Sequence, residues 1–483
     1  MITDTSDLDL RRRRTWTLVL ASLGVFMTAL DTLVVTTALP VLRVSLHSSL
    51  SDLEWTVNAY NLAFACSLLT GAALGDRFGR RRMFCVGLGL FTAASAGAAL
   101  APSIGALIAA RAVQGIGAAL LSPAALSIVT TTFKDGSERN KALGVWGAVA
   151  GSGGAAGVLL GGALTQGPGW QWVLWVNVPI GLVAAAVAPT LIAESRAQAL
   201  RHFDLSGALS VTAGLSVLVY ALVEANSAGW GSVQTIALLA VAAGLLATFA
   251  AIEQRSKAPL MPFSIFRVRT VTGANVVGLL TGGSLFSMFF FISLYMQQVL
   301  GYDAIKAGLS YLPLALSIIV AAGVASQLVT RVGFKPVLAT GMALVAAGLL
   351  WFSRIPVHGS FLGDILGPSL LAAIGLGFAF VPVTIAAVSG VRDRDQGLAS
   401  GMTNTSQQVG GALGLAVLSA ISTSVIGTAH DRATLTSGFH SAFLAGAAIA
   451  TLGFLATIVL IRASDSRAHV QLARALPTAG AAG

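Results

Sequence analysis

Long apolar stretches separated by short polar segments occupy most of this chain of 483 residues. A helix that crosses the hydrocarbon core of a bilayer needs about 20 mostly apolar residues. Fourteen stretches reach that length, so the pattern predicts an all-α polytopic membrane protein with 14 transmembrane helices. These stretches are residues 16–39, 53–75, 82–101, 104–130, 140–165, 172–193, 205–224, 233–253, 271–297, 305–330, 335–353, 361–388, 397–426 and 440–462.

The composition supports this class of protein. Hydrophobic residues make up 55% of the chain and charged residues 10%, whereas soluble domains carry about 25% charged residues. Cys66 and Cys85 lie in apolar stretches, where we interpret them as small hydrophobic residues and not as a disulfide or metal ligands. The four arginines Arg11–Arg14 precede a stretch of span length, so we expect an uncleaved first helix.

The net charge of +10 at first suggests a nucleic-acid partner, but the positions of the basic residues change this interpretation. If the N-terminus is cytoplasmic, 24 of the 29 basic residues lie on the cytoplasmic side, four lie in outer loops and one, Arg111, lies inside a span. Cytoplasmic loops of membrane proteins are enriched in Lys and Arg. We therefore expect both termini in the cytoplasm, a lipid bilayer around the chain and no nucleic-acid partner.

Internal repeats divide the chain into two related parts. Three glycine-containing patterns recur after 257, 254 and 260 residues. They pair Gly144, Gly153 and Gly157 with Gly401, Gly410 and Gly414, Arg77-Phe78-Gly79 with Arg331-Val332-Gly333, and Gly115-Ile116-Gly117 with Gly375-Leu376-Gly377. Two related six-helix halves are typical of alternating-access transporters, which bind substrate between the halves.

These observations predict five regions along the chain. They are a cytoplasmic tail at 1–15, a first six-helix half at 16–193, an inserted helix pair with flanking loops at 194–270, a second six-helix half at 271–462, and a disordered cytoplasmic tail at 463–483. The last region is polar and rich in alanine, and chain ends of this kind are often disordered.

Asp31 and Arg111 are charged residues inside spans. Inserting an Asp costs about 3 kcal/mol, so such a residue indicates function. Both lie about 10 Å from the outer ends of their helices, at 1.5 Å per residue. Because a carboxylate beside a fixed cation can change its protonation with solvent access, we assign proton coupling to this pair. The alternatives are an Asp satisfied by hydroxyls and an Arg that clamps backbone carbonyls.

The short turn between spans 2 and 3 reads GAALGDRFGRRR from Gly71 to Arg82. It places one acid among four arginines, and Asp76 has no role in orienting the chain. We predict that the acid contacts an arginine or a helix N-terminus and locks one conformation. The alternative is a simple topology anchor. The residues of the predicted lock are Asp76, Arg77, Gly79, Arg80 and Arg81.

Glycines recur through the apolar stretch from residue 144 to residue 162. A helical glycine costs about 1 kcal/mol in water, whereas small residues in lipid let two helices pack closely. We predict a bent helix that packs against a neighbour, expected from the other half, and the alternative is an ordinary small-residue packing face. The glycines concerned are Gly144, Gly153, Gly157, Gly161 and Gly162.

Taken together, these segments resemble the major facilitator superfamily, and within it the fourteen-span drug:proton antiporters of the EmrB/QacA type. Asp76 through Arg81 match the signature loop of the superfamily, with Ala72 where glycine is usual. Arg111, Gln114, Gly115 and Gly117 match its fourth-span motif, which the family links to proton transfer. The glycine spacing resembles the antiporter motif, except that Val158 replaces the motif's proline.

The resemblance implies a major facilitator fold and proton-coupled export (antiport) of drugs or antibiotics across the cell membrane. It implies no cofactor, because the proton gradient drives transport, and a small amphipathic organic substrate. Apolar walls with a few polar groups suit such ligands. Polar and aromatic candidates for the substrate cavity are Asn58, Tyr60, Asn61, Gln114, Trp146, Phe286, Phe289, Tyr295, Gln298, Asn404, Gln407 and Gln408.

Other functions remain open at this point. The same fold serves proton-coupled transporters of other small metabolites or lipids, including nutrient importers, although the family's importers lack the glycine pattern. A membrane sensor that transports nothing would not need Asp31 and Arg111 buried together. The chain carries no HExxH, no P-loop and no GxSxG with a triad, so we predict that it is not an enzyme and holds no catalytic or metal site.

Overall fold

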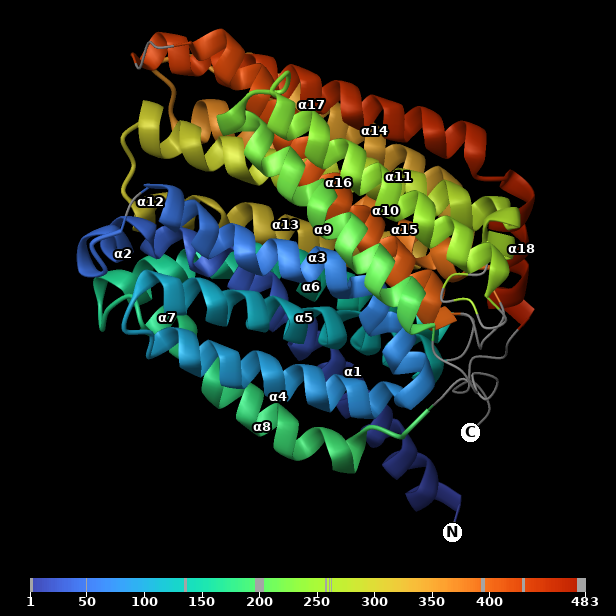
Figure 1. The fold of residues 1–483 in the computed structure, drawn as a ribbon. Helices are drawn as coiled ribbons and strands as arrows, with labels where there is room; N and C mark the ends of the chain where they lie inside the picture. Colours follow the sequence, from blue (N-terminus) through green and yellow to red (C-terminus); the bar gives the residue numbers. More distant parts are fainter. Residues whose placement is uncertain are drawn as a thin grey trace.

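The computed structural model describes residues 3–48, 50–133, 137–195, 204–256, 259, 261, 263–391, 396–427 and 431–475. Long helices run side by side through one bundle (Figure 1). Among the described residues, 13 helices are long and apolar enough to cross a membrane, and one bent pair makes up to 14. The prediction of an all-α protein with 14 transmembrane helices agrees with this count.

The first half contains six long helices and three short ones. The long helices are α1 (Thr3–Val34), α3 (Leu50–Phe78), α4 (Arg80–Ala99), α5 (Ile104–Thr132), α6 (Ser137–Gln166) and α8 (Asn177–Leu191). The short ones are η1 (Thr36–Ala38), α2 (Leu39–Ser45) and α7 (Trp172–Trp175). Pro40 lies in the first turn of α2, where a backbone N–H would have no partner within the helix, so the lack of an N–H in proline removes no helical hydrogen bond.

The second half repeats this plan with three further short turns. Its helices are α11 (Arg269–Leu294), η3 (Tyr295–Val299), α12 (Ala304–Ser310), α13 (Leu312–Val332), α14 (Phe334–Phe352), η4 (Phe361–Ile365), α15 (Leu366–Val388), α16 (Gln396–Ile426) and α17 (Arg432–Leu460). The helix α17 starts well before the predicted stretch 440–462.

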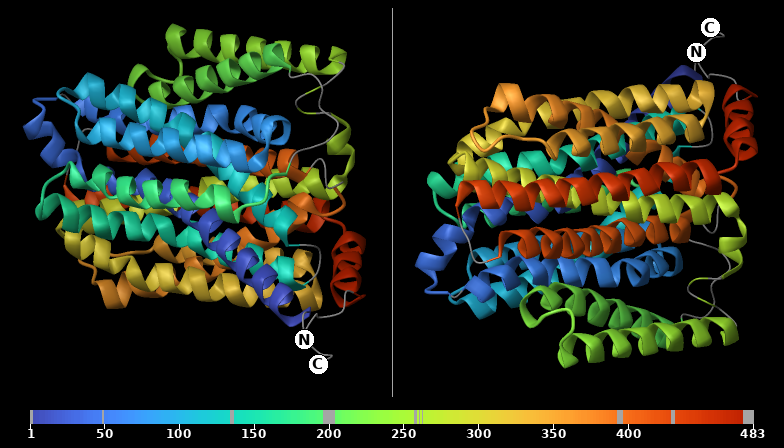
Figure 2. Two further views of the ribbon diagram at one scale, coloured as in Figure 1. Left: turned by 90° about the horizontal axis from the view of Figure 1, so that it is seen from below. Right: turned by 90° about the horizontal axis from the view of Figure 1, so that it is seen from above.

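The inserted helix pair, α9 (Leu205–Ala228) and α10 (Val233–Arg255), lies at the edge of the bundle (Figure 2). A short turn, η2 (Phe263–Arg267), leads from it to the second half. Trp55 of α3 stacks on Tyr220 of α9 with 5.6 Å between ring centroids. Thr70 and Thr212 share a hydrogen bond of 2.9 Å between their hydroxyls. The helix α9 therefore packs on the outside of both halves, against α3 and α16, and the pair supplies no member of either six-helix core.

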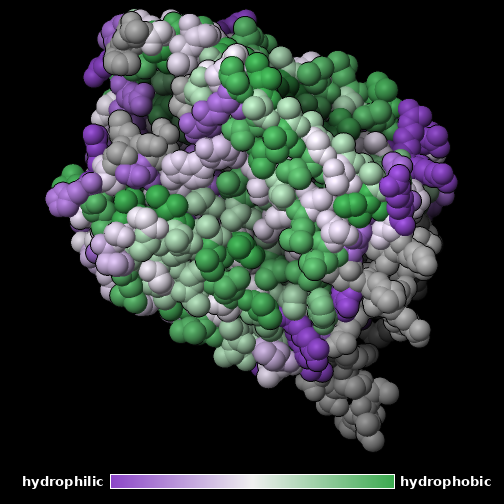
Figure 3. Space-filling view, viewed as in Figure 1, coloured by the Kyte–Doolittle hydropathy of each residue, from purple (hydrophilic) through white to green (hydrophobic). Residues whose placement is uncertain are grey.

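The two ends of the bundle differ, and the start of α1 lies at the same end as α18 (Figure 1). We call the end that carries the start of α1 the terminal end, and the end that carries α2, α7 and α12 the far end. Apolar side chains cover the middle of the visible face, and hydrophilic ones gather toward the ends (Figure 3). Large apolar side chains such as Val183, Val320 and Leu362 are more than 60% exposed, as expected for a surface that faces lipid.

Glycine contacts show the internal repeat in three dimensions. Gly157 of α6 packs on the backbone of Leu30 in α1, and Gly414 of α16 packs on Gly283 in α11. Gly79 and Gly333 end α3 and α13 with positive φ values of 113° and 91°. These two predicted matches are therefore confirmed.

The third predicted match is wrong by two residues. Gly117 packs on Gly87 and Phe91 of α4, and Gly375 packs on Gly341 and Val345 of α14. The equivalent of Gly117 is therefore Gly375 and not Gly377. The repeated Gly-x-Gly pattern misled the alignment, because two glycines two residues apart can be matched in either register.

The predicted disorder of residues 463–483 is also wrong for its first part. Residues Ala463–Ala475 form the helix α18, which lies across the terminal end of α13 and α14 (Figure 2). Ser466 is buried, and its hydroxyl accepts a hydrogen bond of 3.1 Å from the Lys335 N–H. Ser466 and Val470 lie four residues apart on the buried face of this helix, whereas Arg467 and Ala468 are exposed, so the helix is amphipathic, which the alanine content had obscured. Residues 476–483 lie outside the described part of the chain.

Candidate proton-coupling site

Asp31 and Arg111 form a buried ion pair within the first half. The Nη1 group of Arg111 donates to Oδ2 of Asp31, and both side chains have 0% exposure. Asp31 lies near the end of α1, and Arg111 lies about two turns into α5, so both are in the far half of the membrane-spanning segment. The two charged residues of matching depth therefore meet in a direct ion pair.

Two amides complete the surroundings of the carboxylate. Gln114 and Asn177 donate from Nε2 and Nδ2 to Oδ1 of Asp31, at 2.8 and 2.9 Å. Both amide nitrogens also lie within 3.3 Å of the Ser95 hydroxyl oxygen, and that hydroxyl donates to the carbonyl of Leu174. Oδ1 accepts two N–H groups and therefore uses both of its lone pairs, so protonating Oδ1 would displace one of the two amides. Protonating Oδ2 would remove the charge that pairs with Arg111.

Arg111 has further partners on α3 and α5. Its Nε donates to the Thr56 carbonyl at 3.2 Å, and its Nη1 donates to Oε1 of Gln114 at 2.9 Å. The guanidinium lies over the ring of Tyr60 at 4.3 Å from the centroid, and the Tyr60 hydroxyl donates to the Thr28 carbonyl. Arg111 therefore binds both Asp31 and a backbone carbonyl, so the ion pair and the carbonyl clamp coexist.

The glycines of α6 pack directly beside the acid. The segments Glu138–Gly154 and Leu159–Gln166 meet at an angle of 40°, which agrees with the predicted bend. Added side-chain carbons at Gly153, Gly157 and Gly161 would run into α1 between Phe26 and Val34 or into Thr37 just beyond it. The expectation of a partner helix from the other half is therefore wrong for these three residues.

The positions of the glycines along α6 explain this contact. Gly153, Gly157 and Gly161 recur at every fourth residue, so they lie on one helix face, and α1 covers that face. Gly144, in contrast, makes the predicted contact between halves, because it packs against Ser326 of α13. Gly162 is buried within α6. The side chain of Val158 lies outside the described residues.

The predicted lock is centred on the turn between α3 and α4. Arg80 donates from Nε and Nη2 to Oδ1 of Asp76, at 3.2 and 3.0 Å, and both residues are buried. Gly79 has a φ of 113°, which favours glycine, and a side chain there would run into Glu194. Arg77 lies over the Phe78 ring at 5.1 Å. The predicted contact between the acid and an arginine is therefore present.

Glu194, which follows α8, is a member of this turn that the sequence did not reveal. Its Oε1 accepts the Arg81 N–H at 3.1 Å, and its Oε2 lies 3.7 Å from Nε of Arg81. The Arg80 N–H donates to the Ser195 carbonyl at 3.0 Å. Glu194 and Ser195 thus satisfy backbone N–H groups at the start of α4, where Gly79 has no side chain to do so. An isolated acid in a loop carries no periodic signal, so only the fold reveals its partner.

The two halves meet closely at the terminal end. Asn140 of α6 donates to the Thr330 hydroxyl of α13 at 2.8 Å, and Ser326 donates to the Asn140 carbonyl. Ala72 of α3 packs on Gly401 of α16. The small Ala72 therefore fits because its neighbour in the second half is a glycine, and the terminal end is closed by direct contacts.

The predicted cavity residues are found in different places. Tyr60 and Gln114 belong to the buried Asp31 cluster, and Tyr295 is buried with its hydroxyl donating to the Pro356 carbonyl. Asn404 donates to the Ser122 hydroxyl across the two halves at 3.3 Å. Phe289 stacks on Tyr311, Trp146 is buried, and Gln298 is exposed. Asn58, Asn61, Gln407 and Gln408 are partly buried, and the Phe286 side chain lies outside the described residues.

Two facing six-helix halves, with a buried ion pair in one of them, define a polytopic membrane transporter. The family model of the Major Facilitator Superfamily matches residues 21–415. The chain therefore belongs to the major facilitator superfamily, as the sequence predicted, and it is a multi-pass membrane transporter and not an enzyme.

Relatives and a solved structure agree with this assignment. The chain is 42% identical to the cephamycin export protein CmcT of Amycolatopsis lactamdurans over 436 residues, which cover 89% of each chain. It is 37% identical to the tetracenomycin C resistance and export protein of Streptomyces glaucescens, over 86% of this chain and 77% of that one. Its fold resembles that of the human organic anion transporter MFSD10 (TETRAN) with a TM-score of 0.64 at 16% identity, covering 92% of this chain and 99% of that one.

Proposed function

We propose that this protein exports drugs or antibiotics across the cell membrane in exchange for protons. The buried Asp31–Arg111 pair carries the proposal of proton coupling, because it is a titratable group in a transporter core. The names of the relatives, which describe antibiotic export and resistance, support the direction and the class of cargo. The energy source is the proton gradient, no cofactor is required, and the substrate is a small amphipathic organic molecule.

In this proposal a proton moves on and off Asp31 during alternating access. Protonation removes the negative charge and so abolishes the ion pair with Arg111, and a proton on Oδ1 would also displace Gln114 or Asn177. Gly153 and Gly157 hold α6 against the segment of α1 that carries Asp31. A rearrangement of the carboxyl group therefore acts on the α1–α6 packing, and α6 contacts the second half through Asn140 and Gly144.

We also propose that the terminal end faces the cytoplasm, with both termini inside. The experiment uses single cysteines in a protein that lacks Cys66 and Cys85. A cysteine at Gly231, between α9 and α10, should react with an impermeant maleimide in intact cells, whereas one at Ala468 of α18 should react only after permeabilisation. Labelling in the reverse order would refute this orientation.

The coupling proposal is tested with Asp31→Asn in proteoliposomes. The amide keeps the size of the side chain but holds no titratable proton, so uptake driven by a pH gradient should stop. Exchange of labelled for unlabelled substrate at equal pH should continue, because it needs no net proton movement. Asp431→Asn, which changes an exposed carboxylate at the start of α17, is the matched control. Gradient-driven transport by Asp31→Asn at the wild-type rate would remove the role of Asp31.

A further inference from the structure

Trp146 of α6 has a buried polar group without a partner. The residue is 5% exposed, and its indole N–H makes no hydrogen bond within the described part of the chain. Buried indole N–H groups in proteins usually find an acceptor, because leaving such a donor unpaired costs about 1–3 kcal/mol. The sequence selected this position as a cavity candidate because it is aromatic and lies on a span expected to face the centre of the fold.

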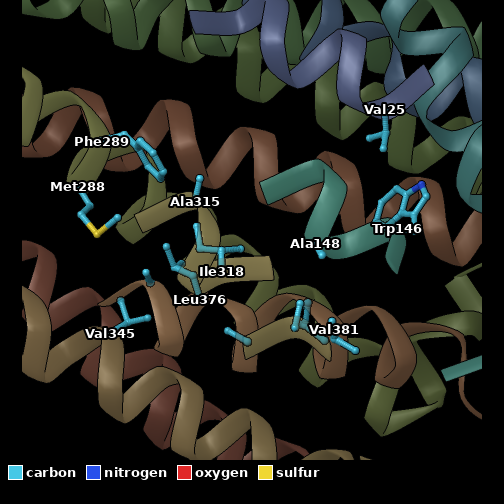
Figure 4. Packing of buried hydrophobic residues seen from close by; sticks show 14 of the residues in the cluster. Val25, Trp146, Ala148, Met288, Phe289, Ala315, Ile318, Val345, Leu376 and Val381 are labelled. Carbon is cyan, nitrogen blue, oxygen red and sulfur yellow. The ribbon is translucent and has the colours of Figure 1, made fainter. Parts of the chain in front are cut away.

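Trp146 lies where the two halves meet. Figure 4 shows it between Val25 of α1 and Val381 of α15, with Ala148 nearby on α6. The next residue, Gly147, is so close to Val381 that an added carbon would lie 3.4 Å from its Cγ2. The Trp146 side chain is therefore held at the boundary between the halves, where alternating-access transporters bind their substrates.

The second-half helices that pack on the first half carry almost no charge. They are α12, α13, α15 and α16. The charged residues within their bounds are two cations, Lys306 of α12 and Arg331 next to the end of α13. In the first half Asp31 and Arg111 neutralise each other at 0% exposure. An organic cation that entered the interface between these helices would lose its hydration without meeting a carboxylate within the bounds of these described second-half helices, which is unfavourable in a medium of low polarity.

We propose that the Trp146 indole N–H donates a hydrogen bond to the transported molecule, and that the preferred substrates are uncharged amphipathic molecules with an exposed acceptor such as a carbonyl. This inference rests on the proposed export function and makes its substrate class specific. The indole ring contacts apolar parts of the substrate, and the hydrogen bond from the N–H fixes the orientation of the substrate. The Asn404 amide and the Ser122 hydroxyl, which meet across the halves, offer a second polar contact within the same interface.

The first test compares protection against neutral and cationic drugs in an efflux-deficient bacterial host that expresses the protein. Chloramphenicol, which is uncharged and carries an amide carbonyl, and a panel of neutral carbonyl-bearing antibiotics form one group. Ethidium and tetraphenylphosphonium, which are permanent cations, form the other. We expect at least about a fourfold rise in the inhibitory concentration for a neutral drug, equivalent to about 0.8 kcal/mol, and no change for either cation.

The second test uses Trp146→Phe, which keeps an aromatic ring and removes the N–H. For a neutral drug that the wild-type protein exports, the apparent affinity should fall about three- to tenfold, the range for loss of one hydrogen bond. The maximal rate and the pH-gradient dependence should stay the same. Trp351→Phe, at a half-exposed tryptophan on α14, is the matched control and should change nothing.

The possible results separate the inference about substrate class and the Trp146 hydrogen bond from the proposed export function on which it rests. Proton-driven export of a permanent cation with no export of neutral drugs would overturn the substrate class but leave the export function intact. Unchanged affinity in Trp146→Phe for every exported neutral drug would overturn the hydrogen bond. Protection against no drug in either group would overturn both the inference and the proposed export function.

Discussion

The two halves of the molecule share their packing but differ at the positions that carry charge. The contact of Gly157 with Leu30 matches that of Gly414 with Gly283, so Asp31 in the first half corresponds to Ser284 in the second. Both side chains are buried completely. By the equivalence of Gly117 and Gly375, Arg111 corresponds to Ser369, which is also buried. Two serines thus occupy the places of the ion pair.

The second half also contains a buried aromatic cluster on α11, α14 and α17. Phe291 packs on Phe439 and Phe443, and Phe352 stacks on Phe443 with 5.1 Å between centroids. Such a cluster is stabilised by burial and by ring geometry and responds little to pH. The comparison teaches that one helix scaffold can carry a titratable pair in one half and rigid packing in the other, so proton coupling need not involve both halves.

The largest effect that we expect comes from Arg111→Ala. It leaves the Asp31 carboxylate buried without its cation, and breaking a buried pair in this way typically costs about 3–5 kcal/mol. Ser369→Ala, at the equivalent position, should cost less than about 1 kcal/mol because it removes only a hydroxyl. Thermal unfolding of the purified proteins in detergent measures the difference.

A second variant keeps this prediction testable if Arg111→Ala does not fold. The double change Asp31→Asn with Arg111→Gln removes both charges, so it should recover most of the lost stability while gradient-driven transport stays absent. Equal destabilisation by Arg111→Ala and Ser369→Ala would show that removing the cation of the ion pair costs no more stability than removing the buried hydroxyl of Ser369.

The sequence revealed the members of this site unequally. Asp31 and Arg111 stand out because charged residues inside apolar stretches are rare, and counting residues from the helix ends gave their depth. Asn177 and Ser95 are uncharged, and polar residues of this kind occur in many spans without a role. Their contacts around Asp31 depend on how α4 and α8 pack around α1, which periodicity does not specify.

Helix existence and helix partners likewise differ in how well the sequence predicts them. Apolar length is a local property, and the predicted stretches correspond to the helices of the bundle. The neighbour of a small-residue face is not local, since both α1 and α13 offer surfaces that glycine can approach. That is why the bend of α6 was predicted correctly and its contact with α1 was not. The helix α18 was missed because a short amphipathic segment lacks the apolar length that identifies a span.

The next largest effect should follow from enlarging the glycines that both halves use. In Gly157→Leu the first added carbon would meet the Leu30 carbonyl, a backbone atom that cannot turn aside. Overpacking of this kind costs about 1–3 kcal/mol. In Gly414→Leu the added side chain would run into the backbone of Gly283, so the fold should be destabilised by a similar amount. We expect gradient-driven export to be lost in Gly157→Leu alone, because α1 carries Asp31, the proposed coupling acid, whereas α11 has Ser284 at the equivalent position.

Two changes on the same helix serve as controls for Gly157→Leu. In Gly154→Ala the added methyl group would contact only the end of the flexible Leu33 side chain, so we expect near wild-type export. Val158→Pro restores the proline of the antiporter motif at an existing bend and should impair export much less than Gly157→Leu. A reconstituted assay under an imposed proton gradient compares these variants with the wild type. Full activity in Gly157→Leu would mean that the glycines are ordinary packing.

A smaller effect should come from the contact that α18 makes with the first half. His469 hydrogen-bonds Oδ1 of Asn140 at 3.3 Å, and its ring packs on Phe334. His469→Ala should therefore loosen the closed terminal end. A cysteine at Ser326 should then react with maleimide about three- to tenfold faster, as expected for loss of one hydrogen bond. Arg467→Ala, on the exposed face of α18, is the control, and an equal increase in that variant would contradict a specific role for His469.

The smallest effect concerns the beginnings of α8 and α17, the sixth long helices of the two halves. Asp431 caps α17, whereas α8 begins without a side-chain cap. The Thr434 hydroxyl and N–H donate to the Asp431 carboxyl at 2.7 and 3.1 Å, and these bonds lower its pKa from 3.8. Because the folded carboxyl binds its proton more weakly, the cap stabilises the protein above pH 3.8 and loses this effect as the pH falls through the lowered value.

The Asp431 cap can be tested because Asp431→Asn keeps a capping oxygen but removes the titration. The unfolding temperature of the wild type should fall slightly more than that of the variant as the pH is lowered from neutral to below about 4. The difference should be small, because the carboxylate is exposed to solvent and to salt. Identical pH profiles for the two proteins would show that the Asp431 cap contributes no pH-dependent stability to α17.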